Sequence, residues 1–270
     1  MRYCVNAPPG HLCNDQRCKN GADCQLNPNR RPDRPGPHQV TKDFEAELCR
    51  YTGAPYAVAV NSCTAALLLA VAWHLPRGPE PGWSMHHNWA NGNFEVEIPK
   101  RTYISVPMSI IHAGGRPTFR DEEWLGTYQL KPLPVWDSAR YFTHLMYRQL
   151  SWQPKAKPDA AIMPRRNSWA DQHAMVCVSF HASKTLGLEQ GGAILHDNPE
   201  ADAWLRRARF DGRTEGVAPK DDKFKQVGWH CYLNPSTAAQ GILRLHSLPR
   251  HNAPLPNDDY TDLSAMEIFR

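Results

Sequence analysis

The sequence has no long apolar run and no strong excess of charge of one sign. Its apolar segments fall well short of the roughly 18 consecutive apolar residues that a membrane-spanning helix needs. The first residues, Met-Arg-Tyr-Cys-Val-Asn-Ala-Pro-Pro, lack the apolar core of a secretion signal. We therefore expect a globular protein of the cytoplasm that contacts no membrane.

The charge balance is modest and the chain is long enough for a large core. The 31 basic and 27 acidic residues give a net charge of +4, which fits an anionic substrate or cofactor and does not call for nucleic acid. With 270 residues and 41% hydrophobic content, the chain can form one large core, or one full domain with a small appendage.

Four of the eight cysteines crowd into the first 24 residues. Cys4, Cys13, Cys18 and Cys24 have the spacing C-x8-C-x4-C-x5-C, with His11 between the first two. They offer the four soft ligands that zinc takes, but the paired C-x2-C knuckles of common zinc folds are missing. Zinc binding and a loop-rich extension with reduced thiols both stay open, and we assign no metal site. The expected compartment disfavours disulfides.

Composition divides the chain into three parts. Residues 1–38 are rich in proline, asparagine and arginine, which predicts a Cys/Pro-rich arm without regular structure. Residues 39–250 form the main domain, and residues 251–270 form a short C-terminal tail. The Arg206-Arg207-Ala-Arg209 cluster in the main domain is interpreted as a solvated helix face.

The main domain alternates helices and strands. Apolar residues at helical spacing predict a helix from Thr41 that ends at Gly53, and short apolar runs predict buried strands. Such alternation is typical of an α/β protein with a mostly parallel sheet. The predicted strands are 56–60, 94–98, 117–121, 133–137, 175–180 and 192–195, and the further helices are 65–73, 105–113 and 199–209.

Several polar residues follow predicted strands, where open α/β sheets bind ligands. The turn Ser62-Cys63-Thr64 precedes a helix, so its backbone N–H groups and the Thr64 hydroxyl could face an anion. Asp137 ends an apolar strand, where a carboxylate could hydrogen-bond a pyridinium nitrogen. For both positions, a simple helix cap is the alternative interpretation.

The most informative segment runs from Val178 to Gly192. It reads V-S-F-H-A-S-K-T-L-G-L-E-Q-G-G, so a strand end presents a hydroxyl and then a lysine on a glycine-bounded turn. This segment closely resembles the cofactor-lysine segment of the DegT/DnrJ/EryC1/StrS aminotransferases. The resemblance implies that Lys184 holds pyridoxal 5'-phosphate as an imine and shuttles a proton during catalysis. It also implies that Ser179 contacts the cofactor phosphate.

The resemblance extends over residues 41 to about 248. The stretch from Phe44 to the turn at Thr64 is similar to the family's opening helix, strand and phosphate turn, with Cys63 where Gly or Ala is usual. Thr64 and the Cys63 backbone would then hold phosphate. Tyr103 ends the stretch V-E-I-P-K-R-T-Y, which resembles a family segment whose aromatic residue stacks on the pyridine ring. The resemblance implies this role for Tyr103. Asp137 lies in the stretch V-W-D-S-A-R, which resembles the family segment whose carboxylate contacts the pyridine nitrogen. The resemblance implies this role for Asp137.

Some positions depart from the family pattern. Arg140 stands where Gln or His usually packs against the ring, and His230 stands where an amide often contacts the phosphate across the dimer. The stretch between Phe119 and Leu133 is shorter than in typical members. The chain also stops soon after Leu248, where family members continue into a small C-terminal domain.

The resemblance implies a fold-type-I domain, with helices on both faces of the sheet and a truncated or missing small domain. It also implies a homodimer with active sites at the interface, which transfers an amino group from a donor such as glutamate to a nucleotide-linked keto-sugar. A catalytically silent binding or regulatory protein is one alternative. A sugar dehydratase of the same family is another, although the dehydrating subgroup replaces the lysine with histidine.

Overall fold

The computed structural model describes residues 2–3, 12–13, 38–75, 94–148, 173–257 and 260–269. The chain divides into two compact units, Met1–Pro37 and His38–Arg270. In the first unit, β1 (Arg2–Tyr3) pairs antiparallel with β2 (Leu12–Cys13), so the prediction of an arm without regular structure is wrong for these residues. Cys4, Cys18 and Cys24 lie outside the described residues, so the zinc hypothesis stays untested. None of the described helices is long and apolar enough to cross a membrane.

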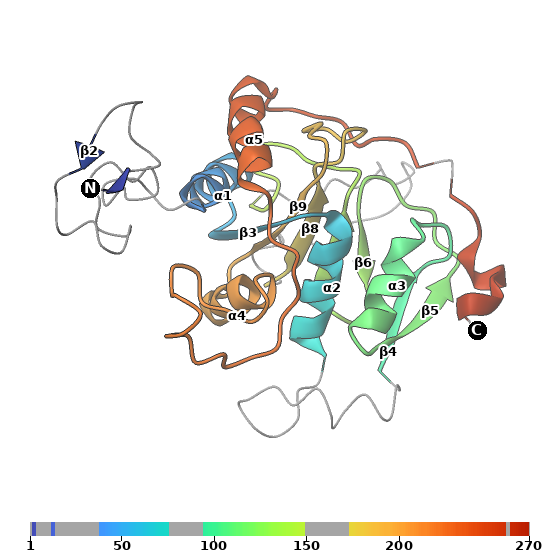
Figure 1. Cartoon of the computed structure of the whole chain (residues 1–270). Coiled ribbons are helices and arrows are strands. Elements are labelled where there is room, and N and C mark those ends of the chain that lie inside the picture. The colour runs from blue at the N-terminus through green and yellow to red at the C-terminus, as the bar shows by residue number, and fades with distance from the viewer. Residues whose placement is uncertain are drawn as a thin grey trace. The chain divides into compact units, whose positions relative to one another are not determined.

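The second unit alternates helices and strands much as the sequence predicts (Figure 1). Its helices are α1 (Gln39–Thr52), α2 (Cys63–His74), α3 (Ser105–His112), α4 (Pro199–Ala208) and α5 (Pro235–Ser247). Its strands are β3 (Tyr56–Val60), β4 (Glu95–Pro99), β5 (Arg116–Arg120), β6 (Tyr128–Leu130), β7 (Val135–Ser138), β8 (Met175–Ser179) and β9 (Gly192–His196). The short 3-10 helices η3 (Leu263–Ala265) and η4 (Glu267–Phe269) follow near the C-terminus.

Five strands form the main sheet in the order β3-β9-β8-β7-β6. β4 and β5 form a parallel pair, and the antiparallel bridge between Glu97 and Lys131 connects this pair to the end of β6. The strands of the second unit therefore run side by side in the order β3-β9-β8-β7-β6-β4-β5. The α/β architecture of the fold-type-I class is confirmed.

Strand direction differs from the expectation of a mostly parallel sheet. Among the described pairs of the five-stranded sheet, only β7 and β8 are parallel. Residues 180–191 return the chain from β8 to β9 without a crossover helix, so β9 runs antiparallel to both of its neighbours. The turn at residues 131–134 likewise folds β7 back against β6. The connections, which the strand pattern does not reveal, determine these directions.

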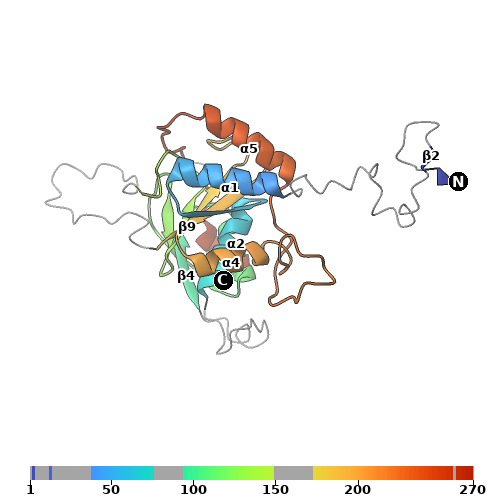
Figure 2. The ribbon, with the colours of Figure 1, turned by 90° about the vertical axis from the view of Figure 1, so that its left-hand side faces the viewer.

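Helices cover both faces of the sheet, as predicted. Side chains alternate along β3, so Val58 and Val60 pack with α2, α3 and α4, while Ala57 and Ala59 pack with α1 and α5. Figure 2 shows α1 and α5 together on one side of the strands. Because both faces are buried, the strands are apolar throughout, as in other α/β proteins.

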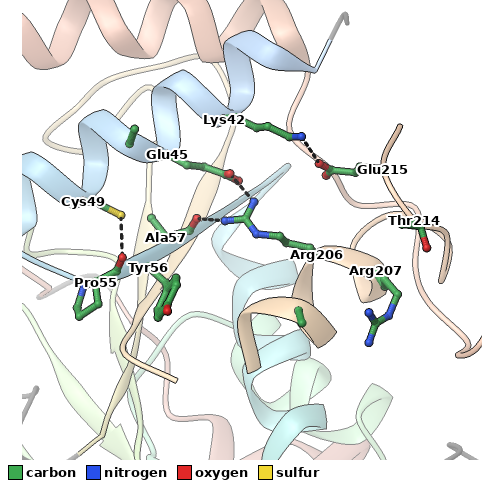
Figure 3. A pocket seen from close by; sticks show the side chains of 12 residues that line it. Lys42, Glu45, Cys49, Pro55, Tyr56, Ala57, Arg206, Arg207, Thr214 and Glu215 are labelled. Carbon is green, nitrogen blue, oxygen red and sulfur yellow. Dashed lines mark hydrogen bonds and ion pairs between the residues drawn. The ribbon is translucent and has the colours of Figure 1, made fainter. Parts of the chain in front are cut away.

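An ion network covers the open edge of β3. The Glu45 carboxylate accepts a hydrogen bond from the Ala59 N–H (2.9 Å) and pairs with Arg209 and Arg206, while Arg209 donates to the Ala59 carbonyl (2.6 Å). Figure 3 shows Arg206 between Glu45 and the carbonyl of Ala57. Arg209 is only 1% exposed, so the interpretation of this cluster as a solvated helix face is wrong for Arg209. The spacing of arginines along one helix cannot reveal a partner on another helix, such as Glu45 on α1 for Arg209.

The segment after α5 packs on the loops around the sheet. Its Leu255 N–H donates to the Arg140 carbonyl, and its Leu263 N–H donates to the Lys100 carbonyl, both at 2.8 Å. The Asn257 amide donates to the Trp124 carbonyl, also at 2.8 Å. Residues 249–257 and 260–269 are thus attached at several points and form part of the second unit.

Candidate active site

A cavity of about 590 Å³ lies where β3, β7 and β8 end. Seven residues singled out in the sequence line it together: Cys63, Thr64, Tyr103, Asp137, Arg140, Ser179 and Lys184. They come from separate segments, and the carboxyl ends of the strands bring these segments to one edge of the sheet. The structure thus places the predicted residues around one common space.

The N-terminus of α2 forms one wall of this cavity. Ser62 caps the helix, because its Oγ accepts the Ala65 N–H at 3.1 Å. The Thr64 hydroxyl is 2.8 Å from the hydroxyl of Ser105, which begins α3 and also lines the cavity. A helix N-terminus carries partial positive charge, so this wall is suited to an anion. Because Ser62 serves as the cap, the Thr64 hydroxyl is not needed for capping and contacts Ser105 instead.

Gly192 allows β9 to start directly beside this turn. A Cβ atom at this position would lie 2.6 Å from the Cys63 nitrogen and 2.7 Å from the Ser62 carbonyl carbon. Both distances are well below any tolerated contact for a carbon atom. The second glycine of the Gly-Gly pair is therefore required for the backbone that forms the anion-facing wall.

Asp137 contributes a buried carboxylate to the lining. It is 5% exposed; its Oδ2 accepts a hydrogen bond from the Tyr128 hydroxyl (2.7 Å) and its Oδ1 accepts one from the Ala139 N–H (2.9 Å). Burial raises the pKa of Asp137 above its ordinary value, while these bonds and the nearby charge of Lys184 oppose the shift. A cationic ligand group in the cavity would favour the charged carboxylate further.

Lys184 lies on the turn that follows β8. The turn is closed by hydrogen bonds from the Lys184 N–H to the His181 carbonyl and from the Leu188 N–H to the Phe180 carbonyl, both 2.8 Å. Gly187 takes a left-handed conformation (φ +62°) within it. Ser179, the last residue of β8, is 8% exposed and lines the same cavity. An amine and a hydroxyl therefore enter the cavity from one strand end, as the sequence predicts.

Arg140 and Tyr103 line the cavity together with Tyr260, which the sequence pattern does not identify. The Arg140 Nε donates to the Tyr260 hydroxyl at 2.9 Å, and its guanidinium carbon lies 4.8 Å from the centroid of that ring. Tyr260 belongs to the segment that the sequence suggested to be a tail. No local pattern marks Tyr260, because its contact with Arg140 spans 120 residues of sequence. Tyr103 is 57% exposed beside this pair.

His230 is the one predicted site residue that does not line this cavity. Its ring is exposed, and its Nδ1 is 2.9 Å from Asp211 Oδ2. It also contacts the ring of Tyr232, with 4.9 Å between the centroids. The predicted contact of His230 concerns a neighbouring subunit, which a single chain does not test.

Together, the lining combines an anion-facing helix terminus, a buried carboxylate and an amine. This set fits a ligand that carries a phosphate and a basic ring nitrogen, with a carbonyl that an amine can attack. Within the described residues, no group of three or more His, Cys, Asp or Glu side chains is arranged to hold a metal ion.

Comparison with known proteins gives one family. The sequence profile of the DegT/DnrJ/EryC1/StrS aminotransferase family matches residues 33–136 and 169–254. A relative, the spore coat polysaccharide biosynthesis protein SpsC of Bacillus subtilis (strain 168), is 40% identical over 233 residues. The match covers 77% of this chain and 56% of SpsC.

Solved structures of similar fold include sugar aminotransferases. CalS13 from Micromonospora echinospora matches with a TM-score of 0.55 and 19% identity, over 77% of this chain and 60% of that chain. NtdA from Bacillus subtilis, determined with bound cofactor PMP, matches with a TM-score of 0.51 and 19% identity, over 77% of this chain and 48% of that chain. At such identities these structures show the common fold alone. The chain spans about half to three fifths of the length of these proteins.

Proposed function

Since the chain belongs to the DegT/DnrJ/EryC1/StrS aminotransferase family, we propose that it is a pyridoxal-phosphate-dependent aminotransferase. It moves an amino group from a donor such as glutamate to a keto group. The observation that carries this proposal is the cavity shared by Lys184, Asp137 and the N-terminal turn of α2. Each of these groups suits a different part of the cofactor.

The residues present fit the cofactor. The Thr64 and Ser179 hydroxyls and the Cys63 backbone N–H would bind the phosphate, because they surround the end of the cavity at α2. Asp137 would hold the protonated ring nitrogen by charge, and Tyr103 would lie against the ring. The bound cofactor supplies an electron sink for the carbon that loses its proton. Arg140 would contact the ring or the substrate from the remaining side.

Lys184 has two tasks in this proposal. Its amine would hold the cofactor in the resting protein, and the same amine would later take up and return the proton of the reacting substrate carbon. The position of Lys184 on a closed turn supports both tasks, because the turn holds the base of the side chain at the cavity wall.

The acceptor is a nucleotide-linked keto-sugar in this proposal. The name of SpsC places that relative in polysaccharide biosynthesis, and CalS13 is a sugar aminotransferase. The net charge of +4 is compatible with an anionic nucleotide substrate. The cytoplasmic location expected from the sequence stays a prediction.

We further propose that two copies assemble with the active sites at their interface. His230 lies outside the cavity of its own chain and is exposed, so it is accessible to a second copy. In that assembly His230 would approach the phosphate end of the partner's cavity. Measurement of the mass in solution, together with PLP affinity in His230→Ala, tests this arrangement.

The amino-donor half of the reaction tests the proposed function without knowledge of the acceptor. Purified chain loaded with pyridoxal 5'-phosphate is mixed with glutamate, and 2-oxoglutarate is measured. We expect about one 2-oxoglutarate per chain from the wild type, none from Lys184→Ala, and an unchanged yield from the exposed control Lys220→Ala. If the wild type forms no 2-oxoglutarate from glutamate and no corresponding 2-oxo acid from a panel of other amino donors, the chain is a silent relative and the proposal fails.

A further inference from the structure

Tyr128 lies behind Asp137, outside the cavity lining. It belongs to β6, and the register of β6 with β7 pairs Tyr128 directly with Asp137. Tyr128 is 2% exposed, and its hydroxyl is 2.7 Å from Asp137 Oδ2. The contact therefore joins two buried side chains on adjacent strands.

A third buried residue completes a chain of hydrogen bonds. The Thr102 hydroxyl is 2.6 Å from the Tyr128 hydroxyl, and Thr102 is 2% exposed. Tyr128 has one hydroxyl proton, which it donates to Asp137, so Thr102 must be the donor to Tyr128. A hydroxyl that accepts one hydrogen bond becomes a stronger donor in the next. Thr102 thus strengthens the bond from Tyr128 to the carboxylate.

We infer that Tyr128, assisted by Thr102, is a positioning residue that fixes the Asp137 carboxylate and favours its charged form. This inference rests on the proposed function, in which Asp137 binds the ring nitrogen of the cofactor. The Ala139 N–H holds the other carboxylate oxygen, so the two donors together define the plane of the carboxylate.

The pKa of Asp137 depends on its burial, on Tyr128 and on several titratable neighbours. Burial raises the pKa of Asp137, and the hydrogen bond from Tyr128 is the largest of the effects that lower it. Burial also raises the pKa of Tyr128 well above its ordinary value, so Tyr128 stays a proton donor. The remaining titratable neighbours are Lys184 on the turn after β8, Arg140 after β7, the half-buried thiol of Cys63 on α2 and the buried thiol of Cys177 on β8; desolvation raises the pKa of both thiols, so they stay neutral.

The shortened stretch between Phe119 and Leu133 explains why the sequence gives no sign of this role. β6 forms within that stretch and returns through a tight turn to β7, which places Tyr128 beside Asp137. In sequence, Tyr128 is an aromatic residue in a region that departs from the family pattern. Its position is evident only from the strand register.

The first test titrates Asp137 in the chain without cofactor. Carbon-13 NMR of chain labelled at aspartate carboxyl carbons follows the Asp137 signal, which Asp137→Asn identifies. We expect its titration midpoint to rise in Tyr128→Phe and to rise less in Thr102→Val. The matched control is Tyr147→Phe, because Tyr147 is also buried and donates one hydrogen bond, but to the Ala174 carbonyl (2.8 Å) rather than to Asp137. The control should leave the midpoint unchanged.

The second test measures binding of pyridoxal 5'-phosphate at several pH values. A lost hydrogen bond to a carboxylate should raise the dissociation constant of Tyr128→Phe about tenfold near neutral pH, and less at higher pH, where Asp137 is charged in both proteins. An unchanged Asp137 midpoint in folded Tyr128→Phe would overturn the inference. If the wild type binds no cofactor, the proposed function fails, while the NMR titration still decides the role of Tyr128.

Discussion

Substitution of Glu45 by glutamine tests the ion network at the edge of β3. Glu45 is 3% exposed and contacts Arg206, Arg209 and the Ala59 N–H. Glutamine keeps the size of the side chain and can still accept the backbone hydrogen bond. The substitution therefore removes one negative charge and replaces the oxygen that accepts from Arg206 with an NH2 group, which cannot accept.

The network gives the expected magnitude. Removal of one partner from a buried ion pair costs about 3–5 kcal/mol, because the remaining charge stays buried without compensation. Here each arginine keeps a second carboxylate, Glu215 for Arg209 and Asp202 for Arg206, both at 2.7 Å. We therefore expect a loss of about 3 kcal/mol in the free energy of unfolding, at the lower end of that range.

The pH dependence adds a second expectation. Burial would raise the pKa of Glu45, but Arg209 and Arg206 outweigh burial and hold it below the ordinary value. A carboxyl whose pKa is lowered on folding stabilises the protein above its unfolded pKa, and this contribution is lost as the pH falls through its folded pKa. The difference between wild type and Glu45→Gln should thus be full at neutral pH and decrease in acid.

Urea unfolding followed by circular dichroism measures the effect. The control is Glu47→Gln on the same helix, because both partners of Glu47 are exposed: the side chain of Arg50 to 69% and that of His246 to 61%. Such a surface pair contributes less than about 1 kcal/mol. A loss for Glu45→Gln no larger than that for Glu47→Gln would refute the assigned role of the network.

Three further predictions concern other parts of the molecule. Gly192→Ala places a Cβ 2.6 Å from the Cys63 nitrogen, so we expect a loss of about 1–3 kcal/mol in urea unfolding and weaker binding of pyridoxal 5'-phosphate. Tyr260→Phe removes the acceptor of the Arg140 Nε hydrogen bond, and steady-state kinetics should show a KM for the acceptor raised about tenfold with kcat little changed. Burial lowers the pKa of His196 to about 4, so the unfolded chain binds this proton first on acidification, and stability falls between pH 6.5 and 4. Unfolding free energies across this range should decrease less steeply in His196→Asn, and equal slopes would contradict the assignment.

Local sequence patterns predict most elements and most of the cavity. The strand at 56–60 has the predicted bounds, and Thr64, Asp137, Ser179 and Lys184 line one cavity because each follows or ends a strand of the same sheet. These positions depend on short-range spacing, which the sequence contains directly. The family resemblance then supplies the cofactor that connects them.

Long-range contacts account for what the sequence does not reveal. Local patterns do not predict β6 and α5, and the antiparallel directions of β6 and β9 depend on how their connections fold. Tyr128 reaches Asp137 through strand register, and Tyr260 reaches Arg140 across 120 residues. Burial of Arg209 likewise requires a partner on another helix. Each of these features results from tertiary packing rather than from local pattern.

The most direct measurement of the central claim is chemical trapping of the cofactor. The chain is incubated with pyridoxal 5'-phosphate, reduced with borohydride and digested, and the peptides are analysed by mass spectrometry. We expect one modified peptide with the cofactor on Lys184, and no modified peptide from Lys184→Ala. Modification spread over surface lysines, or equal in wild type and Lys184→Ala, would contradict the assignment of Lys184 and of the cavity around it.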